Sequence, residues 1–240
     1  SNDWAGILDL AWNPQVIDPP SGYLFSGNHL PVGSWYDDVV YSGLGGNGDT
    51  YRSLQLRHLL GEMAAQDTAL SERALHDLHF NTGSWATERY LDVLNDLHQR
   101  GVIPDDDPET TPVTRQQMAA RVRTGLGRWV NESGAELDQR SVGAPLVNDV
   151  LGAMVTLTRV SGNPDRPAEQ EFGCIWGGAE GGASHFLKAY AADASVLGAV
   201  ETEMVMNVAE YAWKDVTRAD FPPNEKDTSV LSEDVWSWQG

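Results

Sequence analysis

The 240-residue chain has a single cysteine, Cys174, and few positive charges. One cysteine excludes an internal disulfide framework and a cysteine-rich metal site. The chain has 16 Lys and Arg against 35 Asp and Glu, a formal net charge of -19, and this argues against binding to nucleic acid or to anionic membranes. No stretch approaches ~18 consecutive apolar residues, so the sequence predicts no membrane-spanning helix.

What the sequence does contain suits a folded protein. Hydrophobic residues make up 41% of the chain, and nine Trp provide large apolar surfaces for a core or a pocket. We interpret the excess of acidic residues as a solvating surface, and from it we expect a periplasmic or extracellular location.

The pattern of residues changes near Thr50. Residues 1–50 are rich in Gly, Pro and Asn, and Gly22-Tyr23-Leu24-Phe25-Ser26 predicts a short strand entering a loop. Residues 51–240 have mainly helical spacing, with a linker near 101–113 that contains three consecutive Asp. The predicted fold class is therefore mostly α with a few short strands (α+β), in two parts.

Several helices can be placed from apolar stripes and caps. Thr68 can cap the first of them, and Thr114 with Gln117 has the spacing of a capping box, with a stop near Gly134. A further helix is predicted from about Val200 to Lys214. The stripes themselves consist of Leu70, Ala74 and Leu78; Ala86, Tyr90, Leu94 and Leu97; Met118, Val122, Leu126 and Trp129; and Leu146, Val150, Met154 and Leu157.

The stretch from Asp18 to Leu60 carries a resemblance to a known family. Asp18-Pro19-Pro20-Ser21-Gly22-Tyr23-Leu24-Phe25-Ser26-Gly27-Asn28-His29-Leu30-Pro31 is followed by Tyr51-Arg52, Arg57 and Leu59-Leu60. This arrangement resembles an internal segment of the β-chain of penicillin amidases, which are N-terminal-nucleophile hydrolases. The resemblance implies helical layers around antiparallel sheets, with the helical part represented here.

Asn28 is the first candidate catalytic residue. The resemblance implies that its side-chain amide forms part of an oxyanion hole, where one donor stabilises the transition state by about 2.7–4 kcal/mol. Without the resemblance, an Asn beside Pro and Gly is more simply a turn-capping residue.

Arg52 is the second candidate, because it matches a family Arg close to the active site. A guanidinium has five donors in a rigid fork and suits the positioning of other groups. The alternative is a surface Arg that begins an amphipathic helix, and Arg57 fits that alternative better.

The identity of the nucleophile stays open. Ser1-Asn2-Asp3-Trp4 matches the opening of the family's β-chain, where a free N-terminal Ser attacks the amide carbonyl and its own α-amino group acts as the base. A long section that follows in the family, with an Asp-Pro-His segment, has no counterpart here. Ser1-Asn2 could also be left over from a cleaved purification tag, in which case the chain alone would be inactive.

Metal and phosphate sites are weakly indicated. Asp37-Asp38 falls one residue from a possible calcium-ligating Asp of the family, but no cofactor is expected otherwise. His76 and His79 lack a third ligand at a matching offset, so an exposed helix face is the simpler interpretation. The run Gly177 to Gly182 lacks the Lys of a phosphate loop and predicts a flexible loop.

Two functions follow from these observations. The resemblance implies an amide hydrolase that cleaves linear N-acyl amides through an acyl-enzyme, together with the remaining parts of a parent acylase, the α-chain and the rest of the β-chain. The alternative is a non-catalytic helical domain that binds a small apolar ligand or a partner chain.

Overall fold

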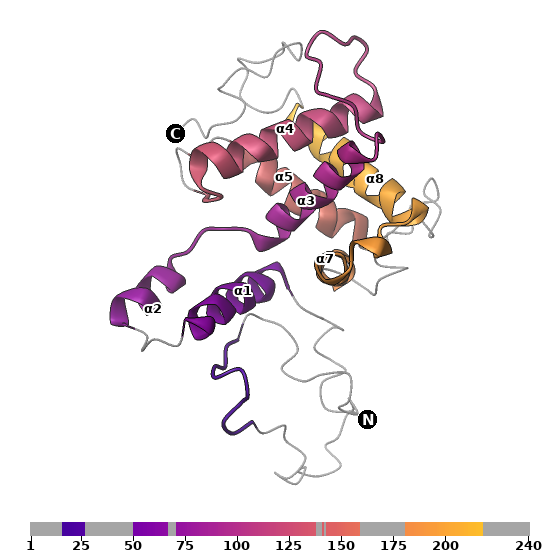
Figure 1. The fold of residues 1–240 in the computed structure, drawn as a ribbon. Coiled ribbons are helices and arrows are strands. Elements are labelled where there is room, and N and C mark those ends of the chain that lie inside the picture. Colours follow the sequence, from indigo (N-terminus) through magenta and orange to yellow (C-terminus); the bar gives the residue numbers. More distant parts are fainter. Residues whose placement is uncertain are drawn as a thin grey trace, which may run out of the picture.

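The computed structural model describes residues 16–26, 50–66, 71–137, 141, 143–158 and 181–217. These residues form seven α-helices and one short 3-10 helix (Figure 1). The elements in chain order are α1 (Tyr51–Ala65), α2 (Glu72–His79), α3 (Trp85–Gln99), α4 (Arg115–Ser133), α5 (Ala144–Thr158), α7 (Gly181–Ala192), η4 (Ala194–Val196) and α8 (Ala199–Val216).

The core lies between α3, α4, α5 and α8, with α7 packed against α3 and α5 (Figure 1). Trp129, Tyr90 and Phe186 are the largest side chains that are fully buried in it. Each large apolar side chain removed from water in this way contributes about 1.5–3 kcal/mol. Hydrophobic burial therefore fixes the arrangement of these helices.

The stripes predicted on α3, α4 and α5 are confirmed in this core, whereas Ala74 and Leu78 of the first predicted stripe lie on α2, which has no buried residue. Tyr90, Leu94, Val122 and Leu126 are almost completely buried. The helix predicted over about 200–214 is α8. Gly134 ends α4 in the left-handed conformation, with φ 62°.

Thr114 caps α4 as expected, but the capping box is incomplete. The Gln117 backbone N–H donates to Thr114 Oγ1 over 3.2 Å. The Gln117 side chain does not return to Thr114; its Oε1 accepts from Asp107 N–H over 3.2 Å and its Nε2 donates to the Asp105 carbonyl over 3.2 Å. The side chain expected to complete the cap instead holds the segment that precedes α4.

Buried Arg121, one turn further along α4 than Gln117, holds the same segment. Its guanidinium donates to the carbonyls of Asp107 and Pro108 over 3.1 and 3.2 Å. It also lies 5.3 Å from the Trp213 ring centroid, a cation–π arrangement. The connection between α3 and α4 is therefore fastened to α4 and, through Trp213, to α8.

Mostly helical structure was the correct expectation, but the short strands are not found among the described residues. Gly22 has φ 75° and its N–H donates to the Pro19 carbonyl over 2.8 Å, which makes a turn. Residues 23–26, where a strand was predicted, have irregular backbone. In the part of the chain that the structure describes, no helix is long and apolar enough to cross a membrane.

The helices α1 and α2 lie to one side of the core (Figure 1). Ser53 and Leu54 are the buried residues of α1, and α2 has none. Ser71 caps α2, whereas Thr68, the predicted cap, lies outside the described residues. The division into parts 1–50 and 51–240 stays a prediction.

Candidate functional site

The two described pieces of the Asp18–Leu60 stretch lie against each other. The Tyr23 hydroxyl donates to the Arg57 carbonyl in α1 over 3.5 Å, a long hydrogen bond. A Cβ added to Gly61, one turn further along α1, would lie 3.8 Å from the same hydroxyl. The Gly-Tyr segment and the helix that carries Arg52 are therefore neighbours in the fold.

Arg52 is in the first turn of α1, and it is exposed. Thr50 caps this turn by accepting from the Ser53 N–H over 3.1 Å. A cation near a helix N-terminus opposes the helix dipole and costs about 0.3–1 kcal/mol. The helix dipole therefore does not favour an Arg at this position, and both the functional interpretation and the alternative of a helix-starting surface Arg stay open.

The other sequence candidates lie outside the described residues. These are Asn28, Ser1 and Asp37-Asp38. The roles proposed for Asn28 and Ser1, and the calcium site, stay predictions. The run Gly177 to Glu180 is also outside, although Gly181 and Gly182 begin α7, where a flexible loop was predicted.

Gln55, which the sequence pattern did not single out, joins α1 to the start of α3. Its Oε1 accepts a hydrogen bond from the Trp85 backbone N–H over 2.5 Å. Its Nε2 donates to Asn81 Oδ1 over 2.9 Å, and the Gly83 N–H donates to the same oxygen over 3.0 Å. A side chain of α1 thus satisfies a backbone donor at the N-terminus of α3.

Charged groups lie between the same two helices. Burial raises the pKa of Glu88 on α3 above its ordinary value, and the neighbouring carboxylates of Asp92 and Glu62 also raise it, against Arg89 and His58. His58 Nε2 is 3.5 Å from the Glu62 carboxylate on α1. The contact between α1 and α3 is therefore polar and sensitive to protonation.

The structure describes both His76 and His79. Both lie on α2, where their rings are 4.6 and 5.1 Å from that of exposed Phe80. Among the described residues no group of three or more His, Cys, Asp or Glu could hold a metal ion. The interpretation of the two His as an exposed helix face is consistent with this arrangement.

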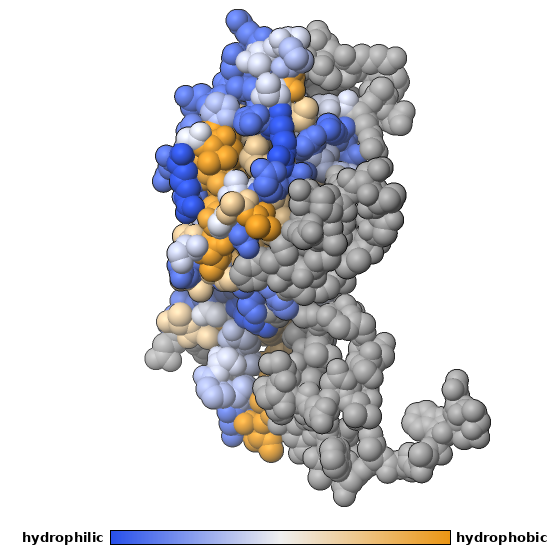
Figure 2. All heavy atoms as spheres, turned by 90° about the vertical axis from the view of Figure 1, so that its right-hand side faces the viewer, coloured by the Kyte–Doolittle hydropathy of each residue, from blue (hydrophilic) through white to orange (hydrophobic). Residues whose placement is uncertain are grey.

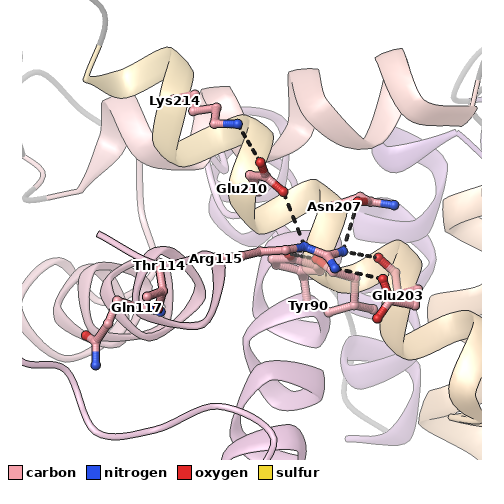
Figure 3. Close-up of polar contacts among 9 residues, drawn as sticks. Tyr90, Thr114, Arg115, Gln117, Glu203, Asn207, Glu210 and Lys214 are labelled. Atoms are coloured by element: carbon pink, nitrogen blue, oxygen red, sulfur yellow. Dashed lines mark hydrogen bonds and ion pairs between the residues drawn. The ribbon is translucent and has the colours of Figure 1, made fainter. Parts of the chain in front are cut away.

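Arg115 forms the densest polar cluster in the structure's described part, between α4 and α8 (Figure 3). Its guanidinium lies 2.7 Å from the Glu203 carboxylate, 2.9 Å from Asn207 Oδ1 and 3.2 Å from the Glu210 carboxylate. Glu210 also pairs with Lys214. Since the guanidinium is directed to protein groups, we interpret this cluster as a structural link between the two helices.

Asp149 on α5 is a second group with a strongly shifted proton affinity. Burial, and to a lesser extent the Asp215 carboxylate on α8, raises its pKa to about 7. Its Oδ2 is buried without a hydrogen bond among the described residues. A carboxyl group with a pKa near 7 can exchange protons at neutral pH, but Asp149 lies on the core helices and not on α1.

The exposed apolar side chains of the described residues are scattered. On the face shown in Figure 2, orange apolar side chains alternate with blue polar ones. The large exposed ones of the described residues come from several parts of the chain: Val16, Ile17, Leu24, Leu75, Phe80, Val102 and Val200. Scattered apolar side chains of this kind are normal on protein surfaces.

Comparison with known proteins gives one match. The family model described as penicillin amidase matches residues 1–238, nearly the whole chain. No curated protein matched the chain, and neither did any solved structure.

Proposed function

The chain belongs to the penicillin amidase family, and on that premise we propose that it is part of an enzyme that hydrolyses linear N-acyl amides. The family match over residues 1–238 is the observation that carries the proposal. The acyl group is hydrophobic or aromatic, and the remaining parts of a parent acylase complete the enzyme. We extend the proposal to a periplasmic or extracellular location.

The proposed reaction passes through an acyl-enzyme. A serine hydroxyl attacks the amide carbonyl, its α-amino group takes the proton, the amine leaves, and water then releases the acid. The nucleophile is Ser1 or a serine of another part of the enzyme. Asn28 donates its amide N–H to the oxyanion, and Arg52 helps to position the surrounding groups.

The geometry around α1 supports the role proposed for Arg52. The helix begins at a well-formed Thr50 cap, and its middle contacts Tyr23 of the Gly-Tyr segment. Asn28 follows that segment by a few residues in the sequence. The Gly-Tyr segment that precedes Asn28 in the sequence therefore lies against the helix that carries Arg52.

The test is acyl transfer by the assembled enzyme, measured with a chromogenic anilide that has an aromatic acyl group. Asn28→Ala should slow turnover about a hundredfold or more, since one oxyanion donor is lost. Arg57→Ala, on the same helix as Arg52, provides a control that should retain turnover. Wild-type turnover in the Asn28 variant would remove Asn28 from the mechanism.

A separate measurement identifies the nucleophile. A serine-directed acylating reagent should add its mass to the peptide that contains Ser1 if Ser1 is the nucleophile. Labelling of a serine in another part of the enzyme would instead assign the attack to that residue. Binding of an apolar ligand without any turnover in the assembled enzyme would favour the non-catalytic helical domain.

A further inference from the structure

We propose that Gln55 is a positioning residue for the candidate site: its side chain fixes α1, and Arg52 with it, to the N-terminus of α3. The inference rests on the function proposed above for Arg52. It adds a residue whose contribution is made through α1 and not through contact with substrate.

The two ends of the Gln55 side chain have different partners. Its oxygen accepts from the N–H of Trp85, the first residue of α3, over 2.5 Å. Its nitrogen donates to Asn81 Oδ1 over 2.9 Å, in the turn between α2 and α3. An amide offers both an acceptor and donors, whereas Lys or Arg could not accept from Trp85.

The contact completes the capping of α3. The N–H groups of the first turn of a helix have no partner within the helix. Ser84 Oγ accepts from the Thr87 N–H over 3.4 Å, and Gln55 satisfies Trp85. The cap of a core helix is thus divided between its own Ser84 and a side chain of α1, so α1 has a defined position relative to the core.

The absence of a side chain at Gly83 leaves space for the Gln55 amide. A Cβ added to Gly83 would lie 2.9 Å from Gln55 Nε2 and 3.1 Å from Asn81 Oδ1. Any larger residue at position 83 would have to displace the Gln55 amide. The glycine therefore makes room for the hydrogen bonds that attach α1.

The spacing on α1 connects this attachment to Arg52. Residues three apart on an α-helix are neighbours on its surface, and Gln55 follows Arg52 by three positions. The fully buried residues of α1 are Ser53 and Leu54, and Tyr51 is partly buried against the core. Loss of the Gln55 hydrogen bonds should therefore let the first turn of α1, which contains Arg52, shift relative to α3.

The first experiment measures amide hydrogen exchange in the full 240-residue chain. Gln55→Ala should speed exchange of the Trp85 amide about tenfold, since its acceptor is lost. The Leu94 amide, in the buried part of α3, should be unchanged. Gln55→Glu keeps an acceptor oxygen beside the helix N-terminus and should retain most of the protection.

Gln116→Ala is the matched control, because Gln116 is exposed on α4. It should leave exchange at Trp85 as in the unmodified chain. If the Trp85 amide stays fully protected from exchange in Gln55→Ala, the proposal that Gln55 attaches α1 to α3 is wrong. An equal loss of protection at the Leu94 amide would also contradict the proposal, because the substitution would then act through general destabilisation.

The second experiment measures anilide turnover by the assembled enzyme. Gln55→Ala should lower kcat several-fold with KM within about twofold, and Gln55→Glu should restore much of kcat. The double variant with Arg52→Ala should be no slower than Arg52→Ala alone, because both substitutions remove one function. Additive losses would overturn the claim that Gln55 acts through Arg52.

The two experiments separate the two proposals. If Arg52→Ala leaves turnover unchanged, the role of Arg52 fails, and Gln55 does not serve it. Loss of Trp85 protection in Gln55→Ala would even then establish that Gln55 anchors α1 to α3.

Discussion

The helices α1 and α3 have the same length, 15 residues, but they are held in place differently. Seven residues of α3 are buried, whereas two residues of α1 are. The position of α3 follows from apolar packing in the core. The position of α1 follows from fewer buried side chains, with Tyr51 partly buried against the core, together with hydrogen bonds of Gln55 and Tyr23 and the charged groups His58 and Glu62.

The difference in burial between α1 and α3 matters for interpreting the sequence. The core helices have apolar stripes that packing explains completely. The Asp18–Leu60 stretch, which carries the resemblance to penicillin amidases, includes α1, whose residues pack little. Packing does not account for exposed Arg52, which is a candidate because of the family resemblance.

Removing a core side chain should have the largest effect on the free energy of unfolding. Trp129 is fully buried on α4, so Trp129→Ala should lower the free energy of unfolding by about 3–5 kcal/mol. Leu75→Ala on exposed α2 should change it by less than about 0.5 kcal/mol. Urea denaturation followed by circular dichroism measures both, and equal effects would remove the distinction between core and periphery.

Breaking the polar link between α4 and α8 should have the second-largest effect on the free energy of unfolding. Arg115→Ala leaves Glu203, Asn207 and Glu210 without their shared partner and should cost about 1–2 kcal/mol in urea denaturation. Arg128→Ala is the control, because Arg128 pairs with Glu132 within one helix, and an exposed ion pair of this kind contributes little to stability. A smaller loss for Arg115 than for Arg128 would contradict the structural role of the cluster.

Because of Asp149, we expect the stability of the folded chain to depend on pH. Its folded pKa, about 7, is above the ordinary value of 3.8, so the folded state binds the proton more tightly than the unfolded state. The contribution of the Asp149 carboxyl group to the stability of the folded state is therefore fully present below about pH 4 and is lost as the pH rises through 7. Asp149→Asn should stabilise the chain at pH 8 by roughly 1 kcal/mol, a value reduced for solvent screening of a half-buried group.

The control is the same comparison at low pH. At pH 4 the carboxyl group of the folded chain is already neutral, so Asp149→Asn should have little effect on the urea midpoint. A stabilisation that is equal at pH 4 and pH 8 would show that the substitution acts through packing and not through the proton.

Glu88→Gln should give the smallest effect, at the contact between α1 and α3. Burial and neighbouring carboxylates raise the folded pKa of Glu88, so its ionisation weakens this contact as the pH rises above the ordinary value. The variant should slow amide exchange in α1 at pH 7 and leave exchange in α5 unchanged. Faster exchange in α1 would mean that the Glu88 charge stabilises the contact.

Local patterns allowed much of the core to be predicted from sequence. The stripe that includes Tyr90 and Leu94, the Thr114 cap and the left-handed stop at Gly134 all depend on residues within one or two helical turns. The helix α7 was not predicted, because Gly181 and Gly182 favour a loop. Burial of Phe186 and Leu187 in the core outweighs that local preference.

The candidate site was less predictable for a physical reason. The role of Gln55 depends on Trp85, 30 residues away, and no periodicity within α1 indicates such a partner. The raised pKa of Asp149 likewise depends on burial and on Asp215 in another helix. The candidates Asn28 and Arg52 came from the family resemblance, since packing patterns carry no information about catalysis.

The segment between α3 and α4 has a practical consequence for cleavage of the chain. Its composition, with Asp105-Asp106-Asp107, Pro108 and Pro112, is typical of a site that a protease would cut. Arg121 and Gln117 hold its backbone at Asp105, Asp107 and Pro108, so the segment cannot easily extend into a protease active site. A cut there would also leave α3 and α4 packed together, and the two fragments should elute as one species.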